Sequence, residues 1–365
     1  MDKKLLALAV SAAMVVPAAA TAGVKLYGKA QVEYNIEDRD GQDSVQSVDD
    51  DGVRSRLGVK FSEKLGGGLT AFGKFEWAMD PADAGSSGAP NDGQNFRARD
   101  AYVGLKSSWG SLAAGSFHAP YKTAGGVKWD PWTATHLQAR RAGGMSGGSG
   151  GISGTNGFIR NAIYYTSPKV NGFKVQFAIM PDETNSGANN DGDDGDNDYS
   201  MAVQYKNGPW HAIFAHNRNN VASGDDETLS KVGLRYKSGP WTVAGQYEVI
   251  DDADTADGSR TLGTSSSQGN GYQVCQGCDA DIMWLNGQYR VGNNIFTLSW
   301  GETDVDVASA SDYDFTYWAA GIIHKFSKKT RIFAGYTETD GDSNDPEVGG
   351  QVDRDAWTVG IRQDF

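Results

Sequence analysis

The residues most able to do chemistry in this sequence are a pair of cysteines, five histidines and a set of lysines and arginines. The cysteines, Cys275 and Cys278, are separated by two residues. Such a pair forms a local disulfide in an exported protein, holds a metal when two further ligands lie close, or acts in redox chemistry within a βαβ unit. Neither further ligands nor a βαβ pattern is evident. The sequence therefore favours a disulfide and predicts no metal and no cofactor.

The charged residues narrow the choice of partner. The net charge of −13 disfavours nucleic acid, since a basic surface is the usual footprint of nucleic-acid binding. Much of the acid lies in runs such as 191–198 (DGDDGDND), which lacks the spacing of an EF-hand and is interpreted as a solvated loop. None of the histidines lies in a recognisable arrangement with a nucleophile and an acid, so the sequence does not predict an enzyme.

The elements that must position these residues are short strands. Residues 25–37 (KLYGKAQVEYNIE) alternate apolar even positions with polar or charged odd positions. This is the period of a β-strand whose two faces meet different environments. The pattern recurs along the chain, and no segment keeps a helical period. Sixteen strands are predicted, at 25–37, 53–61, 69–79, 96–106, 109–116, 158–166, 173–180, 199–206, 210–217, 229–237, 241–250, 281–290, 295–303, 313–326, 331–338 and 355–365.

The connections between these strands alternate between short turns and long loops. Tight turns on one rim and long loops on the other are typical of an outer-membrane barrel, in which an even number of antiparallel strands closes. Lipid then covers the apolar faces, which sixteen strands cannot all hide in one soluble core. The sequence therefore predicts an all-β fold, a 16-stranded antiparallel transmembrane β-barrel with short periplasmic turns and long external loops. A barrel of this size is wide enough for an aqueous channel.

The first residues predict export of the chain. Lys3 and Lys4 precede an apolar stretch, and Ala20-Thr21-Ala22 fits an A-x-A cleavage site. The apolar stretch is too short to span a membrane comfortably, because a transmembrane helix needs about 20 apolar residues. We therefore expect a signal peptide at 1–22 and the barrel at 23–365.

The longest connection, 117–157, is the third long loop of the predicted barrel. A loop of this length is usually functional, and its glycine-rich end lets the chain bend sharply. Folded inward, it would narrow the lumen and bring its charges there. Its aromatic residues, Tyr121, Trp129 and Trp132, either form a track for sugars or pack the loop against the wall. Its charged residues are four basic ones and one acid, namely Lys122, Lys128, Arg140, Arg141 and Asp130.

Several short motifs resemble those of the Gram-negative general diffusion porins. They are LYGKA (26–30), SRLGVK (55–60), RDAYVGLK (99–106) and RNAIYY (160–165), together with a C-terminal Phe365. The resemblance implies passive diffusion of small hydrophilic solutes and ions through a homotrimer in the outer membrane, among lipid and lipopolysaccharide. It also implies that the third loop folds into the lumen and that the barrel-assembly machinery recognises Phe365.

The resemblance further implies a ladder of basic residues on the wall at the constriction, formed by Lys29, Arg56, Arg99 and Arg160. Lys29, Arg56 and Arg160 lie on the polar positions of their strands, as a lumen-facing role requires. Arg99 shares its parity with Val103 and Leu105. It therefore reaches the lumen only through a β-bulge or from above the bilayer.

This sequence departs from the family on the third loop, where Asp130 is the only acid opposing the ladder, and Arg140 and Arg141 add positive charge. A constriction lined mainly by basic groups favours anions. The acidic outer loops count less, because salt screens charges beyond about 8–10 Å. We expect a weak anion preference. The alternative is a substrate-specific channel of the same fold, for phosphate, a sugar or an organic acid.

Overall fold

The structure is a computed structural model, and it describes residues 23–39, 43–50, 55–79, 81–82, 97–146, 157–181, 197–220, 226–252, 261–262, 272–273, 278–307, 312–341 and 353–365. The predicted signal peptide at 1–22 lies outside the described residues, as do Cys275 and most of the acidic run 191–198.

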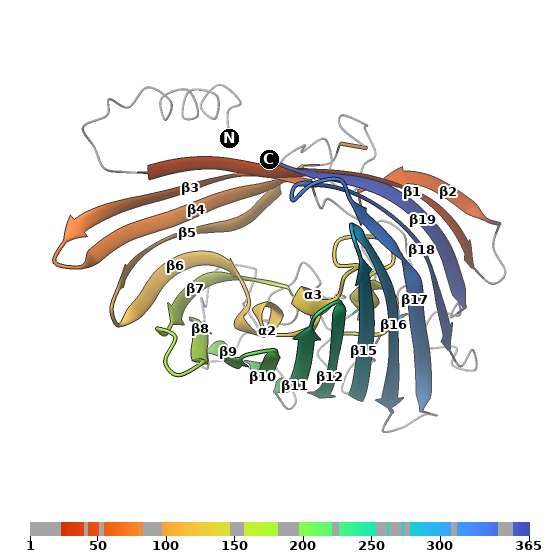
Figure 1. The fold of residues 1–365 in the computed structure, drawn as a ribbon. Coiled ribbons are helices and arrows are strands. Elements are labelled where there is room, and N and C mark those ends of the chain that lie inside the picture. Colours follow the sequence, from red (N-terminus) through yellow and green to blue (C-terminus); the bar gives the residue numbers. More distant parts are fainter. Residues whose placement is uncertain are drawn as a thin grey trace.

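The strands form one antiparallel sheet of 17 strands that curls on itself (Figure 1). β1 closes the sheet by pairing with β19, and its other edge pairs with β3 and then with the short β2. Because β2 and β3 share one edge of β1, sixteen strands surround the lumen, as predicted. The strands of the wall are β1 (Gly23–Arg39), β2 (Val45–Asp49), β3 (Ser55–Gly66), β4 (Leu69–Met79), β5 (Arg97–Ser107), β6 (Gly110–His118), β7 (Phe158–Thr166), β8 (Phe173–Met180), β9 (Asp198–Asn207), β10 (Trp210–Asn219), β11 (Glu227–Ser238), β12 (Trp241–Asp251), β15 (Asp279–Val291), β16 (Asn294–Asp306), β17 (Tyr313–Lys325), β18 (Thr330–Gly341) and β19 (Arg354–Asp364).

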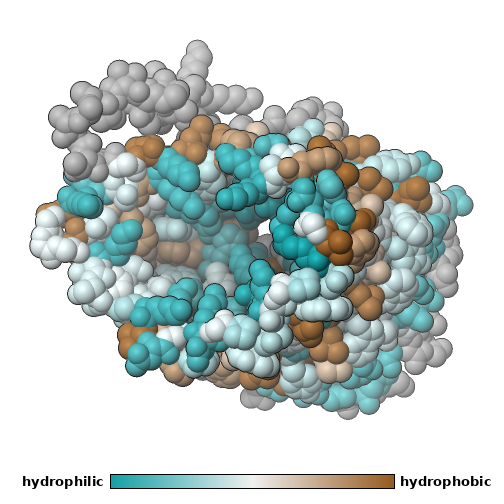
Figure 2. Space-filling model, viewed as in Figure 1, coloured by the Kyte–Doolittle hydropathy of each residue, from teal (hydrophilic) through white to brown (hydrophobic). Residues whose placement is uncertain are grey.

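The two faces of the wall differ as the alternation predicts. On β19, Trp357, Val359 and Ile361 are more than half exposed on the outside, whereas the alternating Ala356 and Thr358 are buried inside. In the space-filling view, hydrophilic residues border the hollow of the barrel, and hydrophobic residues lie on the outer flank (Figure 2). The apolar face therefore points outward and the polar face inward, which is the arrangement expected of a barrel in lipid.

Connection lengths also follow the prediction, with tight turns on one rim. Gly239 and Gly292 adopt positive φ in two of these turns, a conformation that glycine enters without steric cost. Exposed aromatic residues gather beside the short turns, as at a membrane interface; they are Trp109, Phe173, Trp210, Trp241 and Phe326. No helix in the described part of the chain is long and apolar enough to cross a membrane.

The structure adds ordered elements to three of the loops. β2 lies within the predicted loop 38–52, and β13 (Thr261–Leu262) pairs with β14 (Tyr272–Gln273) within 251–280. The loop 117–157, in which no helical period was found, carries the helices α2 (Pro120–Thr123), α3 (Gly126–Trp129) and η1 (Ala139–Arg141). Each of these helices is a single turn, too short for an apolar period to show in the sequence.

The two ends of the barrel meet at a seam. Phe365 donates its backbone N–H to the carbonyl of Gly28 and accepts from the N–H of Gly28, at 3.0 and 3.1 Å. The ring of Phe365 lies where a Cβ on Gly28 would be. The seam thus requires a residue without a side chain opposite the C-terminal ring.

Candidate functional site

The third loop folds into the lumen, as predicted, and several side chains hold it there. The Tyr121 hydroxyl donates to Glu248 Oε2 on β12 at 2.8 Å, and the Tyr317 hydroxyl on β17 donates to the Leu137 carbonyl at 2.7 Å. The Thr339 hydroxyl on β18 donates to the Ala142 carbonyl at 2.9 Å. Burial, followed by the charge of Glu248, raises the pKa of Tyr121 well above its usual value, so this phenol keeps its proton. In Figure 1, α2 and α3 lie inside the curve of the sheet.

A further attachment joins the loop to β1. His136 Nε2 contacts Glu37 Oε2 at 2.5 Å, and Arg354 on β19 donates to the same oxygen at 2.8 Å. The Gln31 amide also donates to the Ala134 carbonyl. These hydrogen bonds tie the loop to strands in different parts of the barrel wall. The loop is therefore held as a fixed constriction.

The aromatic residues of the loop are buried. Tyr121 and Trp132 have no exposed surface, and Trp129 retains 4%. Trp132 packs against the paired glycines Gly321 and Gly335 of β17 and β18, where a side chain would collide with its ring or with the facing backbone. Of the two roles left open for these residues, the structure shows packing against the wall.

A cavity of about 480 Å³ lies beside the loop in the lumen. Of its described lining residues, ten are Lys or Arg and one, Asp130, is acidic. Both oxygens of Asp130 bind the loop itself, since Oδ1 accepts from the Trp132 N–H and Oδ2 from the Ala139 N–H. The basic lining residues are Lys29, Arg56, Arg99, Lys122, Lys128, Arg140, Arg235, Lys237, Arg331 and Arg362.

Most of the residues selected from the sequence meet at this cavity. Lys29, Arg56 and Arg99 reach it from β1, β3 and β5, and Asp130 and Arg140 reach it from the loop. For Arg141, the backbone belongs to η1 and the side chain lies outside the description. Cys278 lies away from the cavity, buried and disulfide-bonded, while Cys275, the other cysteine of the chain, is outside the described residues.

Arg99 reaches the lumen through a bulge. The register between β4 and β5 shifts between Phe75 and Trp77, so that Glu76 faces two residues, Arg99 and Asp100. A bulge of this kind places an extra residue in one strand and interrupts the alternation. Both side chains then point to the polar side, and Arg99 Nε donates to Glu76 Oε1 at 2.8 Å.

Arg160 departs from the expected position. It is exposed and does not line the cavity. The register between β6 and β7 shifts between Gly115 and Phe117, and the neighbouring Asn161 has φ of 49°. The alternation on which the prediction for Arg160 depended is interrupted at this point.

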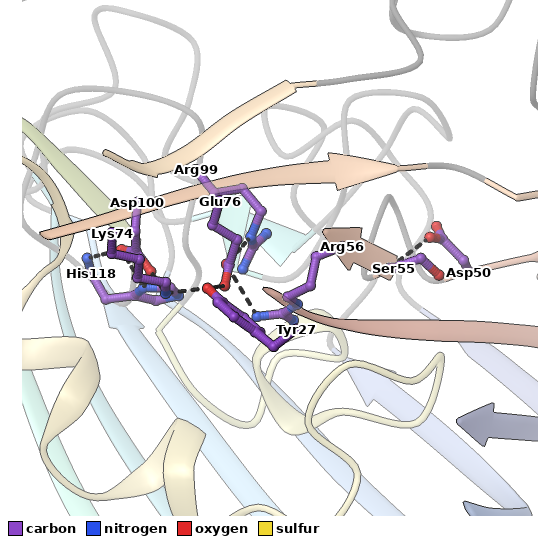
Figure 3. Close-up of polar contacts among 9 residues, drawn as sticks. All are labelled: Tyr27, Asp50, Ser55, Arg56, Lys74, Glu76, Arg99, Asp100 and His118. Carbon is purple, nitrogen blue, oxygen red and sulfur yellow. Dashed lines mark hydrogen bonds and ion pairs between the residues drawn. The ribbon is translucent and has the colours of Figure 1, made fainter. Parts of the chain in front are cut away.

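Sequence reasoning missed two buried carboxylates beneath the basic residues (Figure 3). Glu76 accepts from the Tyr27 hydroxyl at 2.7 Å and pairs with Arg99, with Lys74 at 3.0 Å and with Arg56 at 3.5 Å. Asp100 pairs with Lys74 and with His118 Nδ1 at 2.8 Å. The sequence does place Lys74 and Glu76 on the polar positions of their strand. It does not show the strand register that brings Glu76 close to Arg56 and Arg99.

Basic residues on other parts of the wall were also missed. Arg235 and Lys237 come from β11, Arg331 from β18 and Arg362 from β19. Each occupies a polar position of a predicted strand or of its end. The cavity is therefore lined by cations on several sides, with little acid in reach of its water.

The comparisons with known proteins agree with this architecture. The family described as Gram-negative porin matches residues 7–345. The chain is a Gram-negative porin. It is similar to the major outer membrane protein P.IB of Neisseria gonorrhoeae, with 27% identity over 93% of this chain and 94% of the relative.

Two solved structures share the fold of this porin. The anion-selective porin from Comamonas acidovorans aligns with a TM-score of 0.73 and 21% identity, over 94% of this chain and 100% of that one. The trimer form of OmpT from Vibrio cholerae aligns with a TM-score of 0.63 and 16% identity, over 94% and 99%. The porin is thus a multi-pass β-barrel of the outer membrane and forms a water-filled channel for passive diffusion, as the resemblance implied.

Proposed function

We propose that the channel of this porin prefers small anions, and that the basic residues of the cavity set the preference. The observation that carries the proposal is the lining of ten basic residues against one acid that is engaged within the loop. Cations that line a narrow pore lower the barrier for anions and raise it for cations. The Comamonas relative of similar fold is anion-selective by name, which supports the proposal.

Within this proposal, Lys29, Arg56, Arg99 and Arg140 form the constriction that an anion passes. Asp130 shapes the loop through backbone hydrogen bonds. We also propose a contribution from Arg141 at the loop. Arg160 has no part in the constriction in this proposal.

The test is the reversal potential of single channels in a planar bilayer under a KCl gradient. We expect large ohmic steps in the current. We also expect the reversal potential to be shifted from zero toward the equilibrium potential of chloride. The variant Arg99→Gln should reduce the anion preference, because it removes a lining charge. Arg160→Gln is the matched control and should leave the preference unchanged. A cation preference in the native protein would overturn the proposal.

The alternative of a substrate-specific channel has less support. A sugar track requires exposed aromatic faces in the pore, and those of the third loop are buried. Current that one solute blocks saturably, while related solutes of the same charge do not, would favour the alternative. We propose no enzymatic role for the chain.

The assembly of the channel is also a matter of proposal. We propose a homotrimer, for which the trimer form of the similar Vibrio cholerae OmpT is support, and conductance steps in groups of three would test it. Lipid and lipopolysaccharide would surround the apolar outer face. Recognition of Phe365 by the barrel-assembly machinery and removal of residues 1–22 complete the proposal. N-terminal sequencing of the exported protein should begin at Gly23.

A further inference from the structure

Three cations lie side by side on the inner wall, close to the rim of short turns. The strand register places Lys325 of β17 directly opposite Arg331 of β18, and Arg331 directly opposite Arg362 of β19. We call these three residues the basic row. Directly opposed side chains on antiparallel strands have Cβ atoms about 4.5–5.5 Å apart, and like charges in that position destabilise the sheet. A row of three cations is therefore unfavourable unless something negative offsets it.

The row faces the lumen. Its positions alternate with Ile332 and Ile361, which are exposed on the apolar outer face. Arg331 and Arg362 line the same cavity as Lys29 and Arg56. An anion in the channel water thus has access from the lumen to Arg331 and Arg362 of the row.

The protein offsets little of this charge itself. Arg362 Nε donates to Asp364 Oδ1 at 2.9 Å, and Arg362 Nη2 donates to Asp364 Oδ2 at 3.3 Å. Arg331 Nε is buried and has no hydrogen-bond partner among the described residues. Within the same part of the chain, Lys325 and Arg331 form no ion pair. Among the described residues, one carboxylate therefore serves three cations, and at least one guanidinium N–H lacks an acceptor.

We propose that the basic row is a binding subsite for small multivalent oxyanions, of which inorganic phosphate is the simplest. An oxyanion can accept two parallel N–H bonds from a guanidinium, one on each of two oxygens, and so supplies the missing acceptor, whereas chloride offers the fork a single acceptor atom. The inference rests on the proposed passage of anions and goes beyond it, because it assigns a saturable site at one end of the path. The occupant passes through the channel and dwells at the row.

The experiment measures single-channel chloride current as sodium phosphate is added at neutral pH and constant ionic strength. We expect phosphate to reduce the current saturably, sulfate to act likewise, and nitrate to have no saturable effect. Arg331→Gln should weaken the apparent phosphate affinity about tenfold or more, the order of a lost hydrogen bond to a charged group. Arg331→Lys keeps the charge and loses the guanidinium fork, so it should weaken phosphate binding by a larger factor than it changes the chloride preference.

The matched control is Lys237→Gln, which removes one positive charge from the same cavity on β11, outside the row. It should weaken the phosphate affinity clearly less than Arg331→Gln does, because it leaves the guanidinium forks intact. Equal effects of Lys237→Gln and Arg331→Gln would show general electrostatics and overturn the subsite, as would a native channel whose current ignores phosphate. A native channel that does not prefer anions in KCl would instead be the failure of the proposed function. Heat-modifiable migration in gels checks that every variant forms a closed barrel.

Discussion

At the scale of single residues, Glu76 is a buried acid directly beneath the basic residues of the cavity. Three cations and the Tyr27 hydroxyl share its carboxylate, which is almost fully buried (Figure 3). A buried carboxylate with several donors fixes their side chains and also cancels part of their field. Glu76 thus both positions Arg56 and Arg99 and limits the anion preference they create.

We therefore predict that Glu76→Gln makes the channel more anion-selective. Removal of one negative charge beside the lining residues Arg56 and Arg99 should change the chloride-to-potassium permeability ratio about two- to fivefold, as Coulomb energies in a watery pore suggest. Reversal potentials in a KCl gradient measure the ratio. The control Glu302→Gln removes the same charge from the outward parity of β16 and should leave the ratio unchanged. A lower anion preference in Glu76→Gln would show that positioning outweighs the charge effect.

We predict that Lys128 makes the selectivity depend on pH. It lines the cavity from α3, and its side chain is exposed there. Desolvation by the protein around the cavity, followed by the charge of Arg56, lowers the pKa of Lys128 to about 8. The ammonium is charged below that pH and loses its proton above it.

The anion preference should therefore fall as the pH rises from 7 to about 9, with its midpoint near the pKa of Lys128. In Lys128→Gln this step should disappear and the preference at pH 7 should already be lower. Lys128→Arg should keep the preference constant across the range, since a guanidinium does not titrate there. A step of undiminished size in Lys128→Gln would assign the titration to another group.

At the scale of elements, the alternation of apolar and polar residues predicted which side chains of the wall face the lumen. The prediction failed where a β-bulge inserts one residue into a strand. Lys29 and Arg56 could be placed in the lumen because their strands pair without interruption there. At Arg99 and Arg160 an added residue changes which side chains face inward, and a single sequence does not show where strands slip. Simple alternation placed Arg99 toward lipid, but Arg99 reaches the cavity. It placed Arg160 toward the lumen, but Arg160 does not line the cavity.

The inward path of the third loop was predictable only from the family resemblance. What holds it is a set of contacts between residues far apart in the chain, such as Tyr121 with Glu248 and Leu137 with Tyr317. Such contacts depend on the closed barrel. The glycines Gly321 and Gly335 that form the seat of Trp132 look like any strand glycines in the sequence.

We predict that Trp132→Ala loosens the constriction without opening the barrel. Replacing a fully buried tryptophan leaves a cavity that costs about 3–5 kcal/mol of local packing, and this loss falls on the docking of the loop. Single-channel current should become larger and noisier, while heat-modifiable migration is retained. Trp357→Ala, on the exposed outer face, is the control and should leave the current unchanged. Unaltered current in Trp132→Ala would mean that the hydrogen bonds alone hold the loop.

At the scale of the whole molecule, the charge is divided between two regions of opposite sign. The chain as a whole carries −13, and its acidic runs lie in predicted external loops, yet the cavity beside the third loop is lined mainly by basic residues. Composition alone would suggest a channel for cations. The order of strands and loops shows which charges are near the ion path, and this could be predicted in outline from the sequence.

The balance between these regions should depend on salt. The Debye length is about 3 Å at 1 M and about 30 Å at 0.01 M, so dilute salt extends the reach of every charge. If the lining cations dominate, the anion preference should grow as salt is diluted, because the lumen concentrates anions more strongly. If the acidic loops dominate at long range, dilution should instead reverse the preference toward cations.

Reversal potentials at a fixed twofold KCl gradient, repeated from about 1 M down to about 0.01 M, separate the two cases. We expect the anion preference to increase at each dilution, since a charge beside the path acts on the ion where the channel is narrowest.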